Sequence, residues 1–112
     1  MRKVLIILLA LVCFTGCTIT LGGKSELDEI LERGNYIIVD VRSASEYNEG
    51  HIKGAINIPY TEIGNYKLDK TKTILVYCKS GSRSKSAHDV LEKLGYDVYD
   101  MGAYDDIDLE KE

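Results

Sequence analysis

Apolar, strand-like runs alternate with amphipathic, helix-like stretches along most of this chain. The clearest runs, residues 36–41 and 73–77, are rich in β-branched side chains, which is typical of strands buried on both faces. Strands that alternate with helices favour a parallel sheet, because the intervening helices cross over its faces. The sequence therefore predicts an α/β fold, with strands at residues 36–41, 56–58, 73–77 and 96–101 and helices or helical turns at residues 25–33, 43–49, 61–66 and 84–94.

The start of the chain has the composition of a targeting segment. A short basic start, Met1–Lys3, precedes an apolar run over residues 4–12, which fits a secretory signal and is shorter than the ~20 residues of a membrane span. The following Phe14–Cys17 resembles a bacterial lipobox, in which cleavage leaves a lipid-bearing cysteine at the new N-terminus. We expect a lipoprotein signal peptide at residues 1–16, a lipidated cysteine and short linker at residues 17–24, and the folded domain at residues 25–112.

This interpretation places the domain in the cell envelope, outside the cytosol. Acyl chains on Cys17 would hold it stably to a membrane. Two alternatives stay open: an ordinary signal peptide with an incidental cysteine, and a first short strand at residues 19–21 in place of linker.

The charge balance excludes one class of partner. The chain has 14 basic and 18 acidic residues, and loss of the leader removes two of the basic ones, Arg2 and Lys3. An acidic domain is a poor match for nucleic acid, because phosphates need a basic face. We therefore expect no nucleic-acid partner.

The cysteines constrain the chemistry further. Of Cys13, Cys17 and Cys78, only Cys78 lies in the expected domain, so no disulfide can form within it. Cys78 together with His51 and His88 supplies too few ligands for a four-coordinate zinc site. We expect neither a metal nor another cofactor.

Cys78 is the strongest candidate for a reactive residue. It ends an apolar run and precedes a short Gly/Ser loop that leads into a helical pattern. Such a loop aims backbone N–H groups and the positive end of a helix dipole at one point, which favours the thiolate. Cations at Lys79 and Arg83 lie close in sequence. The alternative is a buried structural cysteine, because a free thiol also packs as a small apolar group.

Two stretches carry a family resemblance. The loop Cys78-Lys79-Ser80-Gly81-Ser82-Arg83-Ser84 resembles the active-site loop of single-domain rhodaneses, which are sulfurtransferases. Residues 40–59, with Asp40-Val41-Arg42, Glu46-Tyr47 and Gly50-His51-Ile52, resemble the other signature of that family. The resemblance implies a three-layer sandwich in which helices cover both faces of a parallel sheet of about five strands.

The resemblance also implies a function. Cys78 would accept sulfane sulfur from thiosulfate or a persulfide, hold it as a persulfide, and pass it to cyanide, a thiol or a protein acceptor. The loop N–H groups and serine hydroxyls would cradle that sulfur. The substrate-binding loop so identified comprises Lys79, Ser80, Gly81, Ser82, Arg83 and Ser84.

Two further functions share this loop chemistry. A sulfur carrier would deliver its persulfide to one protein partner and turn over poorly with small acceptors. Phosphatases and arsenate reductases of the rhodanese-like group have a longer loop than the one between Cys78 and Arg83, and the shorter loop favours a single sulfur atom over a tetrahedral oxyanion.

The remaining polar residues are assigned supporting roles. Arg83 either binds an anionic donor or holds the loop through backbone carbonyls, and both roles stay open. Asp40, Arg42 and Glu46 are expected to form an ion-paired corner that braces the loop. His51 is interpreted as part of a structural turn rather than a base, and His88 as a solvated residue.

The end of the chain departs from the family pattern. Many rhodaneses carry a tryptophan after the final strand, whereas this chain has Tyr104 and no tryptophan. We expect Tyr104 to take over that packing role, and the acidic residues from Gly102 onward to fray.

Overall fold

The computed structural model describes residues 25–112 of the chain. The expected signal peptide, the lipidated Cys17, the linker and the alternative strand at residues 19–21 lie outside the described residues. Within residues 25–112, no helix is both long enough and apolar enough to cross a membrane.

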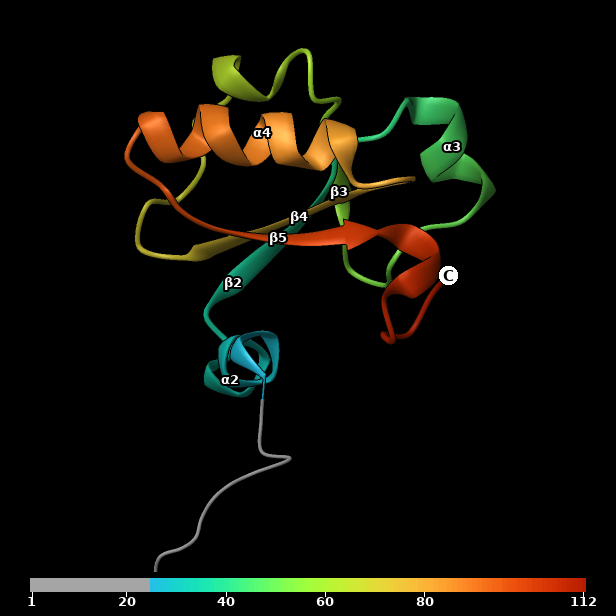
Figure 1. The fold of residues 1–112 in the computed structure, drawn as a ribbon, viewed down its shortest axis with the longest axis horizontal. Coiled ribbons are helices and arrows are strands. Elements are labelled where there is room, and N and C mark those ends of the chain that lie inside the picture. The colour runs from blue at the N-terminus through green and yellow to red at the C-terminus, as the bar shows by residue number, and fades with distance from the viewer. Residues whose placement is uncertain (1–24) are drawn as a thin grey trace, which may run out of the picture.

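Four parallel strands form the central sheet of the described domain (Figure 1). Their order across the sheet is β3 (Ile56–Asn57), β2 (Tyr36–Asp40), β4 (Thr73–Cys78) and β5 (Asp97–Ala103). The register pairs Asp40, the last residue of β2, with Tyr77, the residue before the end of β4, so the two strands end side by side at the carboxyl edge of the sheet. The predicted parallel α/β sheet is confirmed.

Helices cover both faces of this sheet, as predicted. α4 (Ser82–Lys93) and the 3-10 turn η1 (Ile63–Asn65) lie on one face, and α2 (Glu26–Arg33) lies on the other (Figure 1). α3 (Ala44–Glu49) and the 3-10 turn η2 (Tyr104–Asp106) lie near the carboxyl ends of the strands (Figure 1).

Local capping signals begin two of these helices. The Ser25 hydroxyl accepts a hydrogen bond from the N–H of Asp28, whose carboxylate accepts one from the N–H of Ser25. Ser43 and Glu46 form the same reciprocal box at the start of α3, as the sequence predicts. These boxes fix where α2 and α3 start.

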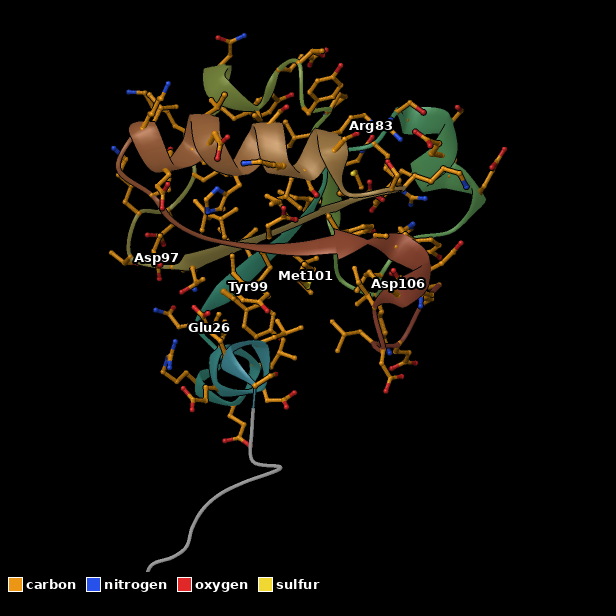
Figure 2. The ribbon with its side chains drawn as sticks, viewed as in Figure 1. Glu26, Arg83, Asp97, Tyr99, Met101 and Asp106 are labelled. Atoms are coloured by element: carbon orange, nitrogen blue, oxygen red, sulfur yellow. The ribbon has the colours of Figure 1, made fainter. Side chains whose placement is uncertain are left out.

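The side chains of β4 divide between two apolar clusters. Ile74, Val76 and Cys78 pack on the α4 side of the sheet, whereas Leu75 and Tyr77 pack on the α2 side. From β5, Tyr99 and Met101 extend toward α2 (Figure 2). All six residues of β4 are buried. Cys78 therefore points toward α4 while its neighbour Tyr77 points to the opposite face.

The expectation of a frayed end after Gly102 is wrong. β5 continues to Ala103, η2 follows, and Ile107 is buried. Residues 110–112 then pair antiparallel with residues 51–53, through three backbone hydrogen bonds of 2.8 to 2.9 Å. Composition alone did not indicate this order, because the partners are backbone groups distant in sequence.

Helix α4 also differs from its prediction. It begins at Ser82, before the expected Ser84, because Gly81 takes a left-handed conformation (φ 102°) that ends the loop early. Ala87 and Leu91 are buried as expected, whereas Val90 and Leu94 are 40% and 44% exposed. The buried stripe of α4 is therefore narrower than its sequence pattern indicates.

Candidate active site

Cys78 ends β4 with its side chain buried beneath the following loop. Its Sγ accepts hydrogen bonds from the backbone N–H groups of Gly81 (3.0 Å) and Ser84 (3.2 Å). Burial by itself raises the pKa of the Cys78 thiol, but hydrogen bonds from the Ser84 hydroxyl and from the backbone of Ser84, Gly81 and Ser80 outweigh it and lower that pKa. The loop thus favours the thiolate, as the sequence predicts.

Two residues of the loop shape this environment. Gly81 has φ 102°, a conformation that costs little only without a Cβ atom, and this turns its N–H toward the sulfur. Ser84 is buried in the first turn of α4, and the single proton of its hydroxyl can point either to the Cys78 thiolate or to the carbonyl oxygen of Gly81, which lies 3.0 Å away. The positive end of the α4 dipole also lies here, which favours a negative sulfur.

Among the described residues, Arg83 contacts a carboxylate rather than the loop carbonyls proposed for it, and its role toward an anionic donor stays a prediction. Its guanidinium forms a two-pronged ion pair with Glu46 of α3, with Nη1–Oε1 at 2.9 Å and Nη2–Oε2 at 3.1 Å. Figure 2 shows Arg83 where α4 begins, beside α3. The pair lowers the pKa of Glu46 to about 2. Arg83 therefore fastens the loop to α3, and its charge is neutralised by a carboxylate.

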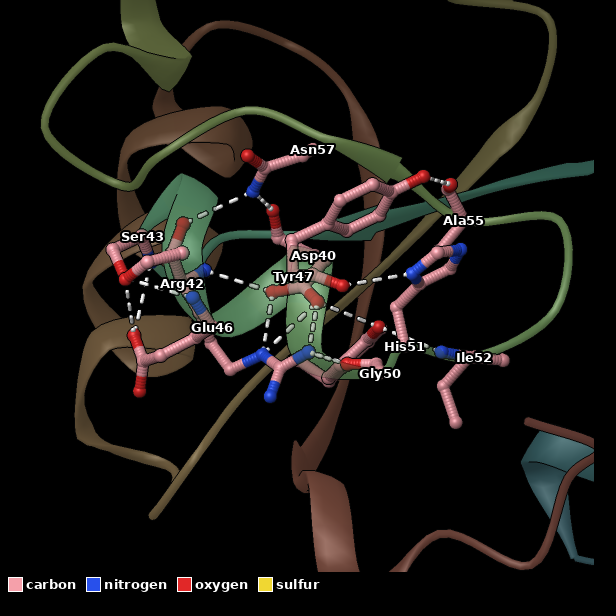
Figure 3. A network of polar contacts seen from close by, with 12 residues as sticks. Asp40, Arg42, Ser43, Glu46, Tyr47, Gly50, His51, Ile52, Ala55 and Asn57 are labelled. Atoms are coloured by element: carbon pink, nitrogen blue, oxygen red, sulfur yellow. Dashed lines mark hydrogen bonds and ion pairs between the residues drawn. The ribbon is translucent and has the colours of Figure 1, made fainter. Parts of the chain in front are cut away.

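Asp40 and Arg42 form the expected buried ion pair (Figure 3). The Arg42 Nε donates to both carboxylate oxygens of Asp40 at 2.9 Å, and Nη2 donates to Asp40 Oδ2 and to the carbonyl of Gly50, each at 2.6 Å. Glu46 belongs to the Arg83 pair and not to this one. The predicted corner is thus two separate pairs, of which the Glu46 pair contacts the loop directly.

Tyr77 is a member of this network that the sequence argument missed. Its hydroxyl donates to Asp40 Oδ2 at 2.8 Å and accepts from the N–H of Ile52 at 2.9 Å. Burial raises the pKa of Tyr77, so the hydroxyl keeps its proton as a donor. The available signal was its position directly before Cys78. The network therefore fixes the strand end that carries the thiol.

Tyr104 packs against the same network. Its ring stacks on Tyr77 with centroids 5.8 Å apart, and the Arg42 guanidinium lies 4.4 Å from the Tyr104 centroid. The predicted packing role for Tyr104 is consistent with these contacts.

The two histidines have no direct contact with the thiol. The His51 ring stacks on Tyr47, and its Nδ1 lies 2.9 Å from the Tyr47 carbonyl, in agreement with a structural turn. His88 contacts Asp89 Oδ1 at 3.0 Å, so the expectation that it is merely solvated is wrong. Within residues 25–112, no group of three or more His, Cys, Asp or Glu side chains is placed to hold a metal ion.

Three loop residues are exposed at the rim, namely Lys79, Ser80 and Ser82. Lys79 has no ion-pair partner among residues 25–112, in contrast to Arg83. A hollow of about 200 Å³ lies beside it, and its wall also includes Tyr104, Glu49 and Asp105. Lys79 is therefore the cation of the loop that is available to an incoming ligand.

Fold and site together define an α/β domain that holds one buried thiol with backbone N–H groups at the carboxyl edge of its sheet. The model of the rhodanese-like domain family matches residues 24–107. The chain therefore belongs to the rhodanese-like domain family.

Individual relatives agree with this assignment. The chain is 38% identical to thiosulfate sulfurtransferase PspE of Escherichia coli (strain K12) over 78 aligned residues. This alignment covers 65% of this chain and 75% of that protein. It is 36% identical to the thiosulfate:glutathione sulfurtransferase of Saccharomyces cerevisiae, over 55% of each protein. A solved structure described as a rhodanese with anions from E. coli has a TM-score of 0.64 and 35% identity, and covers 69% of this chain and 96% of its own. The prediction of a rhodanese-type sulfurtransferase is confirmed at this level.

Proposed function

We propose that this domain transfers sulfane sulfur through a persulfide on Cys78, with thiosulfate or a persulfide as donor and a thiol or cyanide as acceptor. The observation that carries the proposal is the pair of N–H hydrogen bonds to Cys78 Sγ, which favours a nucleophilic thiolate. Relatives named as thiosulfate sulfurtransferases support the choice of donor.

The loading step is a displacement at sulfur. The Cys78 thiolate attacks the outer sulfur of thiosulfate, a bond forms between Sγ and that sulfur, and the S–S bond of thiosulfate breaks with its electron pair leaving on sulfite. The product is the Cys78 persulfide, and no external oxidant is needed. N–H groups of the loop hydrogen-bond the sulfur as its charge shifts.

The discharge step regenerates the thiolate. A thiolate acceptor attacks the outer sulfur of the protonated persulfide, the proton stays on that sulfur, and Cys78 Sγ leaves as the thiolate. The loop N–H groups that lower the pKa of Cys78 also make its sulfur a better leaving group.

Intact mass of the purified domain tests the proposal. After thiosulfate treatment, wild type should gain one sulfur atom and lose it when cyanide is added, whereas Cys78→Ser should gain none. A folded wild-type domain that gains no sulfur from thiosulfate or from a small persulfide would refute the proposal.

Two alternatives have distinct readouts. A sulfur carrier would load once and show little steady-state turnover with cyanide or small thiols. A phosphatase or arsenate reductase would hydrolyse a small phosphate ester or reduce arsenate.

We also propose, from the sequence, that lipid on Cys17 holds the domain to a membrane in the cell envelope. Expression of the full chain with a labelled fatty acid tests this. The wild type should incorporate the label and Cys17→Ala should not, whereas an unlabelled wild type would refute lipidation.

A further inference from the structure

The wall of the hollow beside Lys79 carries charged side chains of both signs, and only some of them are paired within the described part of the chain. Its wall comes from the loop after β4, from the end of α3 and from η2, which Figure 1 shows at the same end of the sheet. Arg42 and Glu46 also line it, but Asp40 and Arg83 neutralise them. The charges left without an ion-pair partner among residues 25–112 are one cation, Lys79, and two carboxylates, Glu49 and Asp105.

This balance of charge discriminates between classes of ligand. A dianion such as thiosulfate would meet Lys79 but also two unpaired carboxylates. A ligand that carries both a carboxylate and an ammonium group can pair with both kinds of wall residue. The volume of about 200 Å³ is below the range of roughly 300–1,000 Å³ typical of drug-sized ligands, so the hollow suits a molecule of amino-acid size.

The hollow borders the loop that follows the proposed nucleophile. Lys79 follows Cys78 directly in the chain, and Glu46 of the wall holds Arg83 of the same loop. A ligand seated here would therefore lie beside the loop that covers Cys78.

We propose that this hollow binds a zwitterionic α-amino-acid thiol as the sulfur acceptor, with its carboxylate toward Lys79 and its ammonium group toward Glu49 and Asp105. The inference rests on the proposed function, since the bound thiolate attacks the outer sulfur of the Cys78 persulfide. A new S–S bond forms on the amino acid, the Cys78 Sγ leaves as the thiolate, and the product is an amino-acid persulfide.

Four small thiols test the inference, because they separate the two charges. Cysteine carries both groups, cysteamine only the ammonium, 3-mercaptopropionate only the carboxylate, and 2-mercaptoethanol neither. The rate at which each discharges the Cys78 persulfide is measured by intact mass. Dividing each rate by the 2-mercaptoethanol rate of the same variant removes general effects on the loop.

The variants should change these ratios in opposite patterns. Glu49→Gln combined with Asp105→Asn should lower the ratios for cysteine and cysteamine by about three- to tenfold, as expected for the loss of two partly exposed ion pairs, and should not lower that for 3-mercaptopropionate. Lys79→Gln should lower the ratios for cysteine and 3-mercaptopropionate by a similar factor. Glu62→Gln combined with Asp108→Asn makes the same change in net charge at exposed positions outside the hollow, and should leave all ratios unchanged.

The outcomes separate the two proposals. If Cys78 loads no sulfur from any donor, the proposed function fails and the acceptor proposal falls with it. If Cys78 loads sulfur but the variants change all four rates alike, or none of the thiols discharges it, only the acceptor proposal is overturned.

Discussion

Arg83 and Glu46, 37 residues apart in sequence, join the active loop to α3 through two parallel hydrogen bonds of 2.9 and 3.1 Å. Both side chains are about three-quarters buried, at 29% and 26% exposure. Two parallel hydrogen bonds between a guanidinium and a carboxylate make a partly buried ion pair stronger than most surface ion pairs.

We expect Glu46→Gln and Arg83→Met each to lower the free energy of unfolding. A double-mutant cycle measured by urea denaturation should give a coupling energy of about 0.5–1 kcal/mol. Lys85→Met, which removes a more exposed pair with Asp89, is the matched control and should cost less. Strictly additive effects of the two substitutions would show that the pair contributes nothing.

The same pair should give the domain an acid-sensitive component of stability. The folded-state pKa of Glu46 is lowered to about 2, chiefly by the Arg83 hydrogen bond. Its contribution is therefore complete above the ordinary glutamate pKa of about 4.3 and is lost as the pH falls toward 2. The difference in unfolding free energy between wild type and Glu46→Gln should be constant from pH 6 to 8 and shrink between pH 4.5 and 2.5. A difference that grows on acidification would contradict this.

Removing the buried hydroxyl of Tyr77 should lower the free energy of unfolding. Tyr77→Phe leaves the N–H of Ile52 without its acceptor and takes one donor from Asp40. We expect a loss of about 1–3 kcal/mol in the free energy of unfolding, the cost of an unsatisfied buried polar group. Tyr66→Phe, at an exposed position, should change stability by less than about 0.5 kcal/mol. Equal effects at the two positions would argue against the network.

The reactivity of Cys78 should depend on Ser84. When the rate of alkylation by iodoacetamide is plotted against pH, the inflection should fall at a lower pH than it does for an ordinary cysteine, because the pKa of Cys78 is lowered. Ser84→Ala removes a hydroxyl that stabilises the thiolate, so the inflection should move to higher pH. Ser86→Ala, two residues further along α4 and exposed, should leave it in place. An unchanged inflection in Ser84→Ala would mean that the backbone alone sets the thiol pKa.

The terminal pairing should be measurable as stability. Deleting residues 110–112 removes three backbone hydrogen bonds to residues 51–53, and we expect a loss of about 1–3 kcal/mol. Replacing the same residues by alanines retains the backbone groups and should cost less. A deletion with no effect on the urea midpoint would show that the pairing is not formed in solution.

Much of this molecule could be predicted from local sequence. The buried run before Cys78, the loop after it and the box formed by Ser43 and Glu46 depend on residues close in the chain. Loop backbone and helix dipole act on Cys78 within six residues, so its role as thiolate could be argued without a structure.

Contacts between residues far apart in the sequence could not be predicted in this way. Arg83 finds Glu46 and Tyr77 finds Asp40 across 37 residues each, and no local pattern states which carboxylate a cation will meet. The order of the last residues likewise depends on backbone groups near His51. Tertiary packing determines each of these three contacts, and the packing cannot be predicted from a single sequence alone.

The pairing of residues 51–53 with residues 110–112 joins segments that are made at different times during synthesis. At ~5–20 residues per second, several seconds pass between the synthesis of the first segment and that of the second. β4, the active loop and α4 are all made in that interval, before Tyr104 can pack against Arg42. A nascent chain therefore carries the thiol strand before the wall beside its loop exists, and that wall is completed only when the segment after β5 has been made.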